Sequence, residues 1–312
     1  MQVYALGSEA AQPDLSSYRD TGDYLIVADF EEADGIRDAL GIAAPAKKTQ
    51  MKADDHVRFE SYDNCDFVGL VLFEFREGRF SFERVDLYFG RNFLLLVAKD
   101  KGGLHGRIAG DLRVERARAA GGREELALLY YRFLNGALSR MFDALARYEE
   151  TLSGVEAGIL TKPDRIDFER IVKMKGTTFR IKKCMRFLLL VGDEIDDNDN
   201  DLIPAKLVKH FKKLDPKINR LYEFAAGLHE AAEHLMDLYD SAVTARTNNL
   251  INKLTIITVF ATPLTVITGI YGMNFVYMPE LQNRYGYFAV LGIMSLCVGV
   301  TYAMLKKLRV LK

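Results

Sequence analysis

The sequence predicts an α/β cytoplasmic N-terminal domain, followed by a long α-helical stalk and two transmembrane helices, the plan of a multi-pass membrane protein. Three observations predict this plan. Short β-rich runs are confined to about the first 110 residues, helical periodicity fills the middle of the chain, and two uncharged apolar runs lie near the C-terminus. We therefore expect three regions, at residues 1–120, 121–250 and 251–312.

The overall composition excludes several classes of protein. The 312 residues are 49% hydrophobic and 27% charged, which excludes a disordered or collagen-like chain. Lys and Arg number 42 and Asp and Glu number 43, so no general basic excess favours nucleic acid, and we expect no such partner. The three cysteines, Cys65, Cys184 and Cys297, are too far apart to suggest a disulfide framework or a CxxC metal pair.

Five runs rich in β-branched and aromatic residues predict strands in the first region. They are DYLIVADF (23–30), HVRFESY (56–62), FVGLVLFEF (67–75), RFSFERVDLYF (79–89) and NFLLLVA (92–98). Glu77-Gly78 and Gly90 punctuate the runs as turn residues. With helices interspersed among these strands, the region belongs to the α/β class.

The second region reads as helical. Residues 123–158 and 168–191 carry apolar side chains at steps of three and four, and Pro163-Asp164 separates the two stretches. The acidic run GDEIDDNDNDLIP (192–204) predicts a loop by composition.

A long stalk helix is predicted to begin at about residue 215, because Asp215 suits an N-cap and Pro216 the first helical position. Continued into the first apolar run, it covers about 55 residues, or roughly 80 Å. Apolar residues at alternating steps of four and three form a seam that we expect to gather several copies of the chain: Leu221, Ala225, Leu228, Ala232, Leu235, Tyr239 and Ala242.

The two apolar runs predict membrane spans at about residues 251–271 and 285–305. Residues 254–270 and 285–305 contain no charge, and a helix needs roughly 20 such residues to cross the hydrocarbon. Buried core helices are the alternative, but soluble hairpins rarely carry two such runs together. Basic residues flank the spans on one side, so both termini are expected in the cytoplasm, with the spans in the inner or plasma membrane. These residues are Arg246, Lys253, Lys306, Lys307, Arg309 and Lys312.

Two apparent metal sites lack the spacing of ligands that a metal site of their type requires. His229 and His234 are five apart, roughly 140° around a helix, whereas a zinc helix places its histidines four apart. An EF-hand-like opening, Asp197-x-Asp199-x-Asp201, lacks the required Gly and Glu further on, so a solvated loop is favoured over a weak divalent site. No P-loop or dinucleotide fingerprint is present, and we expect neither an organic cofactor nor enzymatic activity.

The first span carries one continuous polar and small-residue stripe. At steps of three and four it contains Asn248, Ile251, Thr255, Thr258, Thr262, Thr265 and Gly269. Threonines in a membrane helix also bond their own backbone or a neighbouring helix, which is the alternative interpretation. A whole stripe suits one wall of a water-filled path, because lipid offers hydroxyls no partners. Two spans cannot enclose a pore, so a pore requires several copies of the chain.

The first span ends in Tyr271-Gly272-Met273-Asn274-Phe275, and Met278-Pro279-Glu280-Leu281 follows. Here the chain resembles the CorA family of magnesium channels, whose signature is Gly-Met-Asn at the outer end of the first of two C-terminal spans. The resemblance is close over residues 246–281 and much fainter upstream.

The resemblance implies roles for individual residues. Gly272, Met273 and Asn274 form the selectivity filter, where Asn274 holds a magnesium ion through its water shell. Asn248 matches an inner polar ring, Ile251 and Leu254 an apolar constriction, and Thr265 and Gly269 the pore wall. Thr258 and Thr262 depart from the family pattern, in which apolar residues are usual. The basic tail matches a collar around the stalk: Lys306, Lys307, Arg309 and Lys312. Glu280, beside the mouth, is expected to concentrate cations by its charge.

The predicted function is that of a homopentameric channel for magnesium influx, with cobalt and nickel as further candidate ions. The resemblance implies that cytoplasmic magnesium closes the pore, and the acidic residues 193–201 are our candidates for the sensor. Two alternatives remain. One is a zinc transporter of the related family, which usually has a Gly-Gly-x-Pro loop after the signature; the other is a membrane-tethered divalent sensor or adaptor that does not conduct.

Overall fold

The computed structural model describes residues 2–6, 11–12, 22–42, 57–99, 106, 110, 122–274, 278 and 283–307. Its contacts divide the chain into two compact units, Met1–Tyr239 and Asp240–Lys312.

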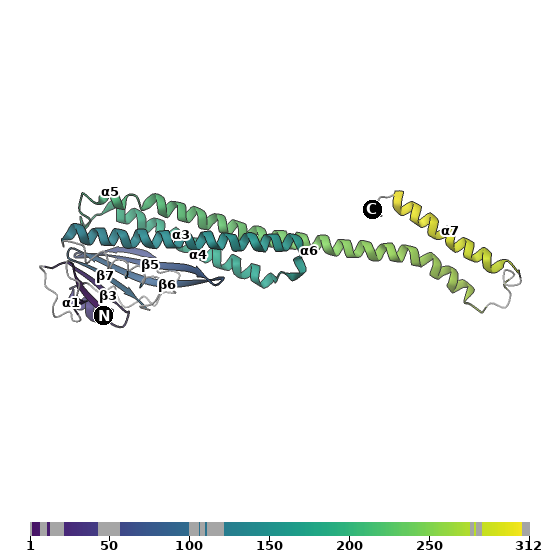
Figure 1. Ribbon diagram of the computed structural model, residues 1–312, viewed down its shortest axis with the longest axis horizontal. Helices are drawn as coiled ribbons and strands as arrows, with labels where there is room; N and C mark the ends of the chain where they lie inside the picture. Colours follow the sequence, from purple (N-terminus) through teal and green to yellow (C-terminus); the bar gives the residue numbers. More distant parts are fainter. Residues whose placement is uncertain are drawn as a thin grey trace. The chain divides into compact units, whose positions relative to one another are not determined.

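The first unit is built on a mixed sheet of seven strands in the order β2-β1-β3-β7-β6-β5-β4. All five strands predicted from the sequence are confirmed, and two short ones at the N-terminus are additional (Figure 1). Only β3 and β7 pair in parallel, whereas the other neighbours are antiparallel. The strands are β1 (Gln2–Ala5), β2 (Ala11–Gln12), β3 (Tyr24–Ala28), β4 (Arg58–Ser61), β5 (Cys65–Arg76), β6 (Arg79–Gly90) and β7 (Phe93–Ala98).

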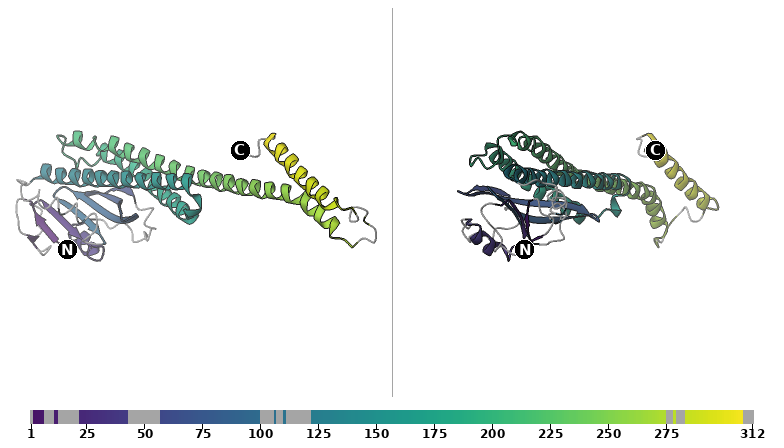
Figure 2. Two further views of the ribbon diagram at one scale, coloured as in Figure 1. Left: turned by 45° about the vertical axis from the view of Figure 1, so that its right-hand side comes forward. Right: turned by 60° about the vertical axis from the view of Figure 1, so that its left-hand side comes forward.

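Helices cover both faces of this sheet. Tyr88 of β6 lies in a core cluster with Ile36 of the short helix α1 (Ala33–Ala39). The next residue, Phe89, faces the opposite way and stacks on Tyr130 of α3 (Arg123–Thr161), with ring centroids 4.7 Å apart. The sheet therefore forms the middle of three layers, as two views in Figure 2 show.

Three long helices lie side by side on the α3 face (Figure 1). A 3₁₀ turn, Pro163–Arg165, joins α3 to α4 (Phe168–Asp197), and the four-residue α5 (Val208–Phe211) leads into α6 (Asp215–Tyr271). The predicted beginning of the long helix at Asp215 is confirmed, and the helix has 57 residues.

The apolar seam of α6 is buried within its own chain over most of its length. Leu221, Ala225, Leu228, Ala232 and Leu235 are each at most 3% exposed in the single chain, and Tyr239 packs against Phe168 of α4. The prediction that this seam gathers several copies is therefore wrong over residues 221–239, because the first unit already covers it.

The acidic run at residues 192–204 is a loop only in its second part. Helix α4 continues to Asp197, since Val191, Gly192 and Ile195 are buried and their packing outweighs the loop-like composition. The helix ends at Asn198, which adopts the left-handed conformation with φ 48°.

The second unit contains the remainder of α6 and α7 (Gly286–Lys307). Both helices are long and apolar enough to cross a membrane, and 0% and 6% of their apolar windows are buried. The core helix of a soluble protein would be mostly buried, so this exposure argues against the alternative considered for the two runs.

Candidate functional site

The candidate filter lies where α6 stops. The Gly272 amide donates to the Thr268 carbonyl at 2.9 Å, and the Met273 amide donates to the Ile270 carbonyl at 3.2 Å. The last turn is thus tightened from four-residue to three-residue spacing, and the chain then leaves the helix. Asn274 follows with an exposed side chain that is not held inside this chain's core.

Gly272 occupies a position with little room for a side chain. A Cβ atom there would stand 3.1 Å from the Thr268 carbonyl oxygen and 3.5 Å from that of Gly269. Both neighbours are backbone atoms, so they cannot move aside as a side-chain end would. The crowding explains why glycine, with no Cβ, suits the first position of the motif.

The electrostatics of this helix end favour a cation. Aligned peptide dipoles place a partial negative charge of about half an elementary charge at a helix C-terminus. Asn274 adds an amide oxygen, a neutral acceptor for the waters that magnesium surrenders reluctantly. The arrangement can therefore attract a hydrated cation and hydrogen-bond its water shell.

The threonine stripe is present on α6, and each of its hydroxyls is directed to the backbone. Thr255, Thr258, Thr262 and Thr265 donate to the carbonyl four residues earlier, at 2.8 to 2.9 Å. This is the backbone bonding foreseen as the alternative interpretation, and it does not use the oxygen lone pairs. With its proton donated inward, each hydroxyl oxygen is left as an acceptor, which is the polarity that water around a cation requires.

The side chains of the stripe are exposed to solvent in the single chain. Ile251 is 53% exposed, Asn248, Gly269 and the four threonines are exposed, and a Cβ added at Gly269 would meet nothing within 4 Å. Leu254, which lies beside the stripe, is 64% exposed. Thr268, off the stripe, lines a groove between α6 and α7 instead. The stripe therefore faces away from α7, as a wall shared with other copies requires.

Aromatic side chains near the connection between α6 and α7 were not among the predicted site residues. Tyr271 ends α6, and Tyr285, Tyr287 and Phe288 surround the beginning of α7 with exposures of 68–71%. Tyrosine and tryptophan collect at membrane interfaces, because their rings are apolar and their polar groups reach water. The clustering of aromatic residues around 271–288 was the available signal for this level of the bilayer.

The basic tail is described only in part. Lys306 and Lys307 form the exposed last turn of α7, whereas Arg309, Lys312 and the outer-loop Glu280 lie outside the described residues.

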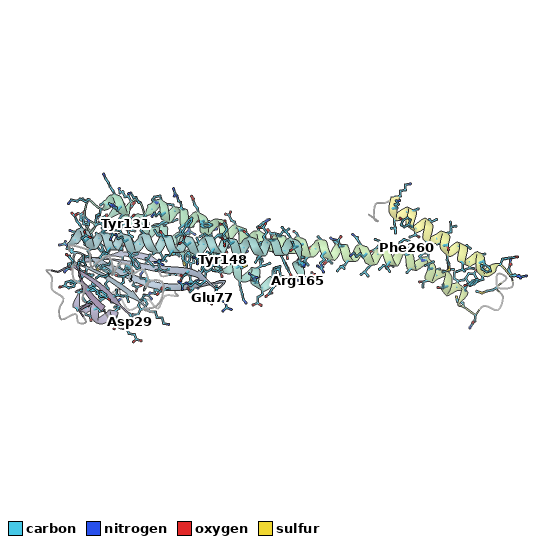
Figure 3. The ribbon with its side chains drawn as sticks, in the orientation of Figure 1. Asp29, Glu77, Tyr131, Tyr148, Arg165 and Phe260 are labelled. Carbon is cyan, nitrogen blue, oxygen red and sulfur yellow. The ribbon has the colours of Figure 1, made fainter. Side chains whose placement is uncertain are left out.

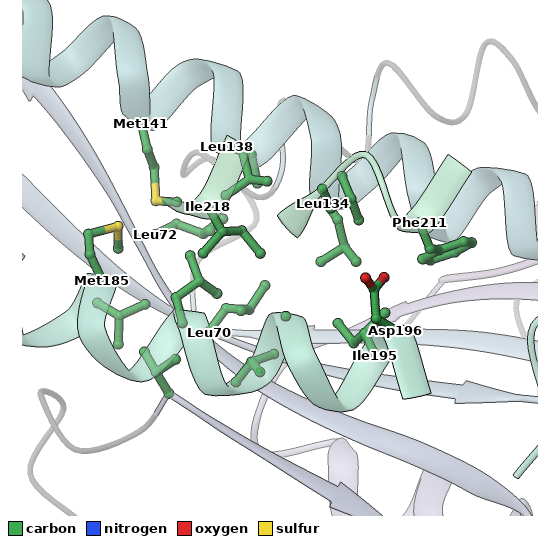
Figure 4. A pocket seen from close by; sticks show the side chains of 17 residues that line it. Leu70, Leu72, Leu134, Leu138, Met141, Met185, Ile195, Asp196, Phe211 and Ile218 are labelled. Carbon is green, nitrogen blue, oxygen red and sulfur yellow. The ribbon is translucent and has the colours of Figure 1, made fainter. Parts of the chain in front are cut away.

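The acidic candidates for a sensor are dispersed. Asp196, on α4, points into a small apolar cavity between Leu134, Phe211 and Ile218 (Figure 4). Burial, followed by the charge of Asp215, raises the pKa of its carboxyl group. Among the described residues, no group of three or more His, Cys, Asp or Glu side chains is placed to hold a metal ion.

The loop after α4 is held by asparagine side chains. Asn198 exchanges two hydrogen bonds with the Ile203 backbone. The Asn200 amide donates to Ser61 Oγ, the Tyr62 carbonyl and Asp66 Oδ1, at 2.6, 2.9 and 3.0 Å. These bonds tie the loop to the edge of the sheet, which makes the solvated-loop interpretation incomplete.

His229, half of the apparent zinc helix, is buried against α4. Its Nδ1 lies 3.1 Å from Thr178 Oγ1, and its ring packs on Phe179. His234 instead lines a separate groove beside Glu149 and Glu223.

A three-layer α/β unit, two helices long and apolar enough to cross a membrane, and a polar stripe ending at an exposed amide are the features of a membrane protein of the metal-ion-transport class. Comparison with known families agrees with this class. The chain belongs to the family described as CorA-like Mg²⁺ transporter protein, whose model matches residues 26–307.

A sequence relative and a solved structure, both named CorA, are similar to this chain over most of its length. The cobalt/magnesium transport protein CorA of Thermotoga maritima is 25% identical over 274 residues, covering 87% of this chain and 78% of that protein. The complete structure of the CorA magnesium transporter from Methanocaldococcus jannaschii has a TM-score of 0.79 at 21% identity and covers 98% of this chain and 96% of that one.

The cytoplasmic domain of ZntB from Vibrio parahaemolyticus has a TM-score of 0.57 at 11% identity, covering 78% of this chain and 98% of that domain. The two structural similarities are below 25% identity and show the fold alone.

Proposed function

We propose that several copies of this chain, five by family resemblance, assemble around the threonine stripe and conduct hydrated magnesium into the cell. The supporting observation is the open row of acceptor oxygens on α6 that ends at Gly272 and Asn274. Two spans cannot surround water, so the stripe has a use only when copies share it. Relatives named for cobalt and magnesium transport make cobalt a further substrate of the same path, and nickel is added by resemblance.

The driving force needs no chemical reaction. An inward-negative potential of 100 mV supplies roughly 2 × 2.3 kcal/mol for a divalent ion. The basic residues after α7 favour a cytoplasmic location for both termini, with the spans in the inner or plasma membrane. Family membership supports transport in place of catalysis.

Closure by cytoplasmic magnesium is part of the proposal. By resemblance to the family, we assign the sensor to ligands contributed by more than one copy; within one chain, no described group of three or more His, Cys, Asp or Glu side chains is placed to hold a metal. The acids at residues 193–201 remain candidates for one side of such a site.

Zinc transport and a non-conducting sensor are the competing functions. The α/β fold does not separate zinc from magnesium, because the ZntB domain shares it. The sequence after the signature favours magnesium, since it reads Phe275-Val276-Tyr277-Met278-Pro279 without the Gly-Gly-x-Pro loop.

Replacing Asn274 with Ala tests the channel directly. We expect magnesium uptake into vesicles containing the purified protein to fall at least about tenfold, the factor that corresponds to ~1.4 kcal/mol. Asn249→Ala is the matched control, because it removes an exposed amide from the same helix, turned about 100° from Asn248 and so off the stripe. Parent uptake no greater than that of empty vesicles would favour the non-conducting sensor. Unchanged uptake in Asn274→Ala would overturn the filter assignment, and uptake of zinc in preference to magnesium would favour the zinc transporter.

A further inference from the structure

A groove of about 900 Å³ opens in the first unit where the β5–β6 hairpin meets α3 and α4. Figure 3 labels Glu77 at the tip of the hairpin and Tyr148 on α3 beside it. The volume falls within the range of small-molecule sites, roughly 300–1,000 Å³. None of the residues assigned above to the ion path lies in its lining.

The charged residues in the groove are all cationic. Among the described residues that line it there is no carboxylate, and the four cations are Arg79, Arg170, Lys173 and Arg180. Lys173 pairs with Glu169 at 2.7 Å, but both side chains are about 70% exposed, so that pair contributes little and can be exchanged for another anion. Cations gathered from a hairpin tip and a helix without lining acids favour an anionic ligand.

The opposite wall is aromatic. Phe80 and Phe82 project from β6, and the Phe80 ring lies 4.8 Å from that of Tyr148. The Arg180 guanidinium lies 3.8 Å from the centroid of the Phe82 ring. Aromatic rings and guanidinium planes of this kind are surfaces on which nucleobases stack.

Gly176 keeps the groove open from the α4 side. After proline, glycine is the least favourable residue inside a helix, and Gly176 lies in the interior of a 30-residue one. A Cβ at this position would meet nothing within 4 Å, so packing does not require a glycine here. The absence of a side chain instead leaves space between Lys173 and Arg180.

We propose that this groove binds a nucleoside polyphosphate, with its phosphates on Arg79, Arg170 and Lys173 and its base against the Phe82–Arg180 surface. Arginine and lysine are the side chains that bind phosphate oxygens. Nucleoside polyphosphates also carry Mg²⁺ on their phosphates, so the ligand is chemically linked to the proposed cargo. Only this link, and not the site itself, rests on the proposed function.

The test measures ATP binding to the purified full chain in detergent by calorimetry. Gly176→Glu adds a carboxylate at a position that lines the groove and where a Cβ meets nothing within 4 Å, and we expect it to weaken ATP binding at least about tenfold. Gly176→Ala separates the effect of a helix-favouring substitution from that of the carboxylate. Gly35→Glu adds the same charge on α1, where a Cβ also meets nothing within 4 Å, and no residue of α1 lines the groove. Both controls should bind ATP as the parent does.

Two further probes separate the parts of the ligand. Tripolyphosphate should bind more weakly than ATP, and Phe82→Leu should weaken ATP but not tripolyphosphate. Equal affinity for both probes would overturn the nucleoside assignment and leave a polyphosphate site. Absence of ATP binding to the parent, or equal binding to Gly176→Glu, would overturn the site itself. Asn274→Ala should still bind ATP, so failure of the transport proposal is distinguishable from failure of this one.

Discussion

Asp66 is a buried carboxyl group at the edge of the sheet, and its titration should be visible in the stability of the chain. It is 6% exposed. Burial raises its pKa, while hydrogen bonds from Ser61 and Asn200 act in the opposite direction. Because the folded-state pKa is above the unfolded one, the folded chain holds this proton to higher pH. The contribution of Asp66 to stability therefore falls as pH rises from about 4 to the raised pKa, and is constant above it.

Asp66→Asn should remove that part of the pH dependence while keeping an acceptor oxygen for its partners. Thermal unfolding of the detergent-solubilised chain, measured from about pH 4 to pH 7, records how the melting temperature changes with pH. Asp237→Asn, an exposed substitution on α6, is the control. If the melting temperature of Asp66→Asn depends on pH as strongly as that of the parent, another group causes the pH dependence.

Thr262 tests the orientation of the stripe at a single hydroxyl. Thr262→Val keeps the side-chain shape but replaces an acceptor oxygen with a methyl group, so the wall holds water less well and uptake of magnesium should fall several-fold. Thr268→Val loses the same type of backbone hydrogen bond but lines the groove towards α7, so its uptake should change little. Equal effects of the two substitutions in vesicle uptake would contradict a stripe that faces water.

At the scale of elements, the junction between α4 and the sheet depends on Asn200. Its amide satisfies three oxygens of β4 and β5 and the turn between them. Asn200→Ala leaves those groups without this donor and should lower the free energy of unfolding by about 1–3 kcal/mol. Denaturant titration measures the change. Asn219→Ala is the comparison, because its exposed amide bonds only within α6, to Asp215. A loss no larger than that of the comparison would mean that the loop is not fixed by Asn200.

At the scale of the whole molecule, folding of the first unit uses the buried seam of α6, and we propose that assembly of copies uses a different part of the same helix. Leu228 is 3% exposed within the chain, so Leu228→Ala should lower stability by about 2–5 kcal/mol without changing the subunit number. Denaturant titration measures stability, and the mass of the solubilised particle measures assembly, with five chains of 35.3 kDa expected. Leu250→Ala, at 54% exposure, should not lower the stability of the first unit. Dissociation of Leu228→Ala at unchanged stability would restore the seam as an assembly surface.

Much of the fold was predictable because it depends on local patterns. The five long strand runs, the helices α3 and α4, the beginning of α6 at Asp215 and the two apolar spans follow from periodicity, turn residues and length. The strands β1 and β2 were not predicted, since runs of four and two residues carry too little pattern. The end of α4 was misplaced, because the buried Ile195 outweighs the acidic residues around it.

The sequence by itself determined the membrane spans, the row of hydroxyls and the Gly-Met-Asn motif, because a span length and a helical stripe depend only on spacing along one helix. Tertiary structure alone decided that the seam of α6 is covered by its own chain, that Asn200 reaches Asp66, and that Arg79 and Arg170 line one groove. Those pairs are far apart in sequence, and only packing of the sheet against the helices brings them together.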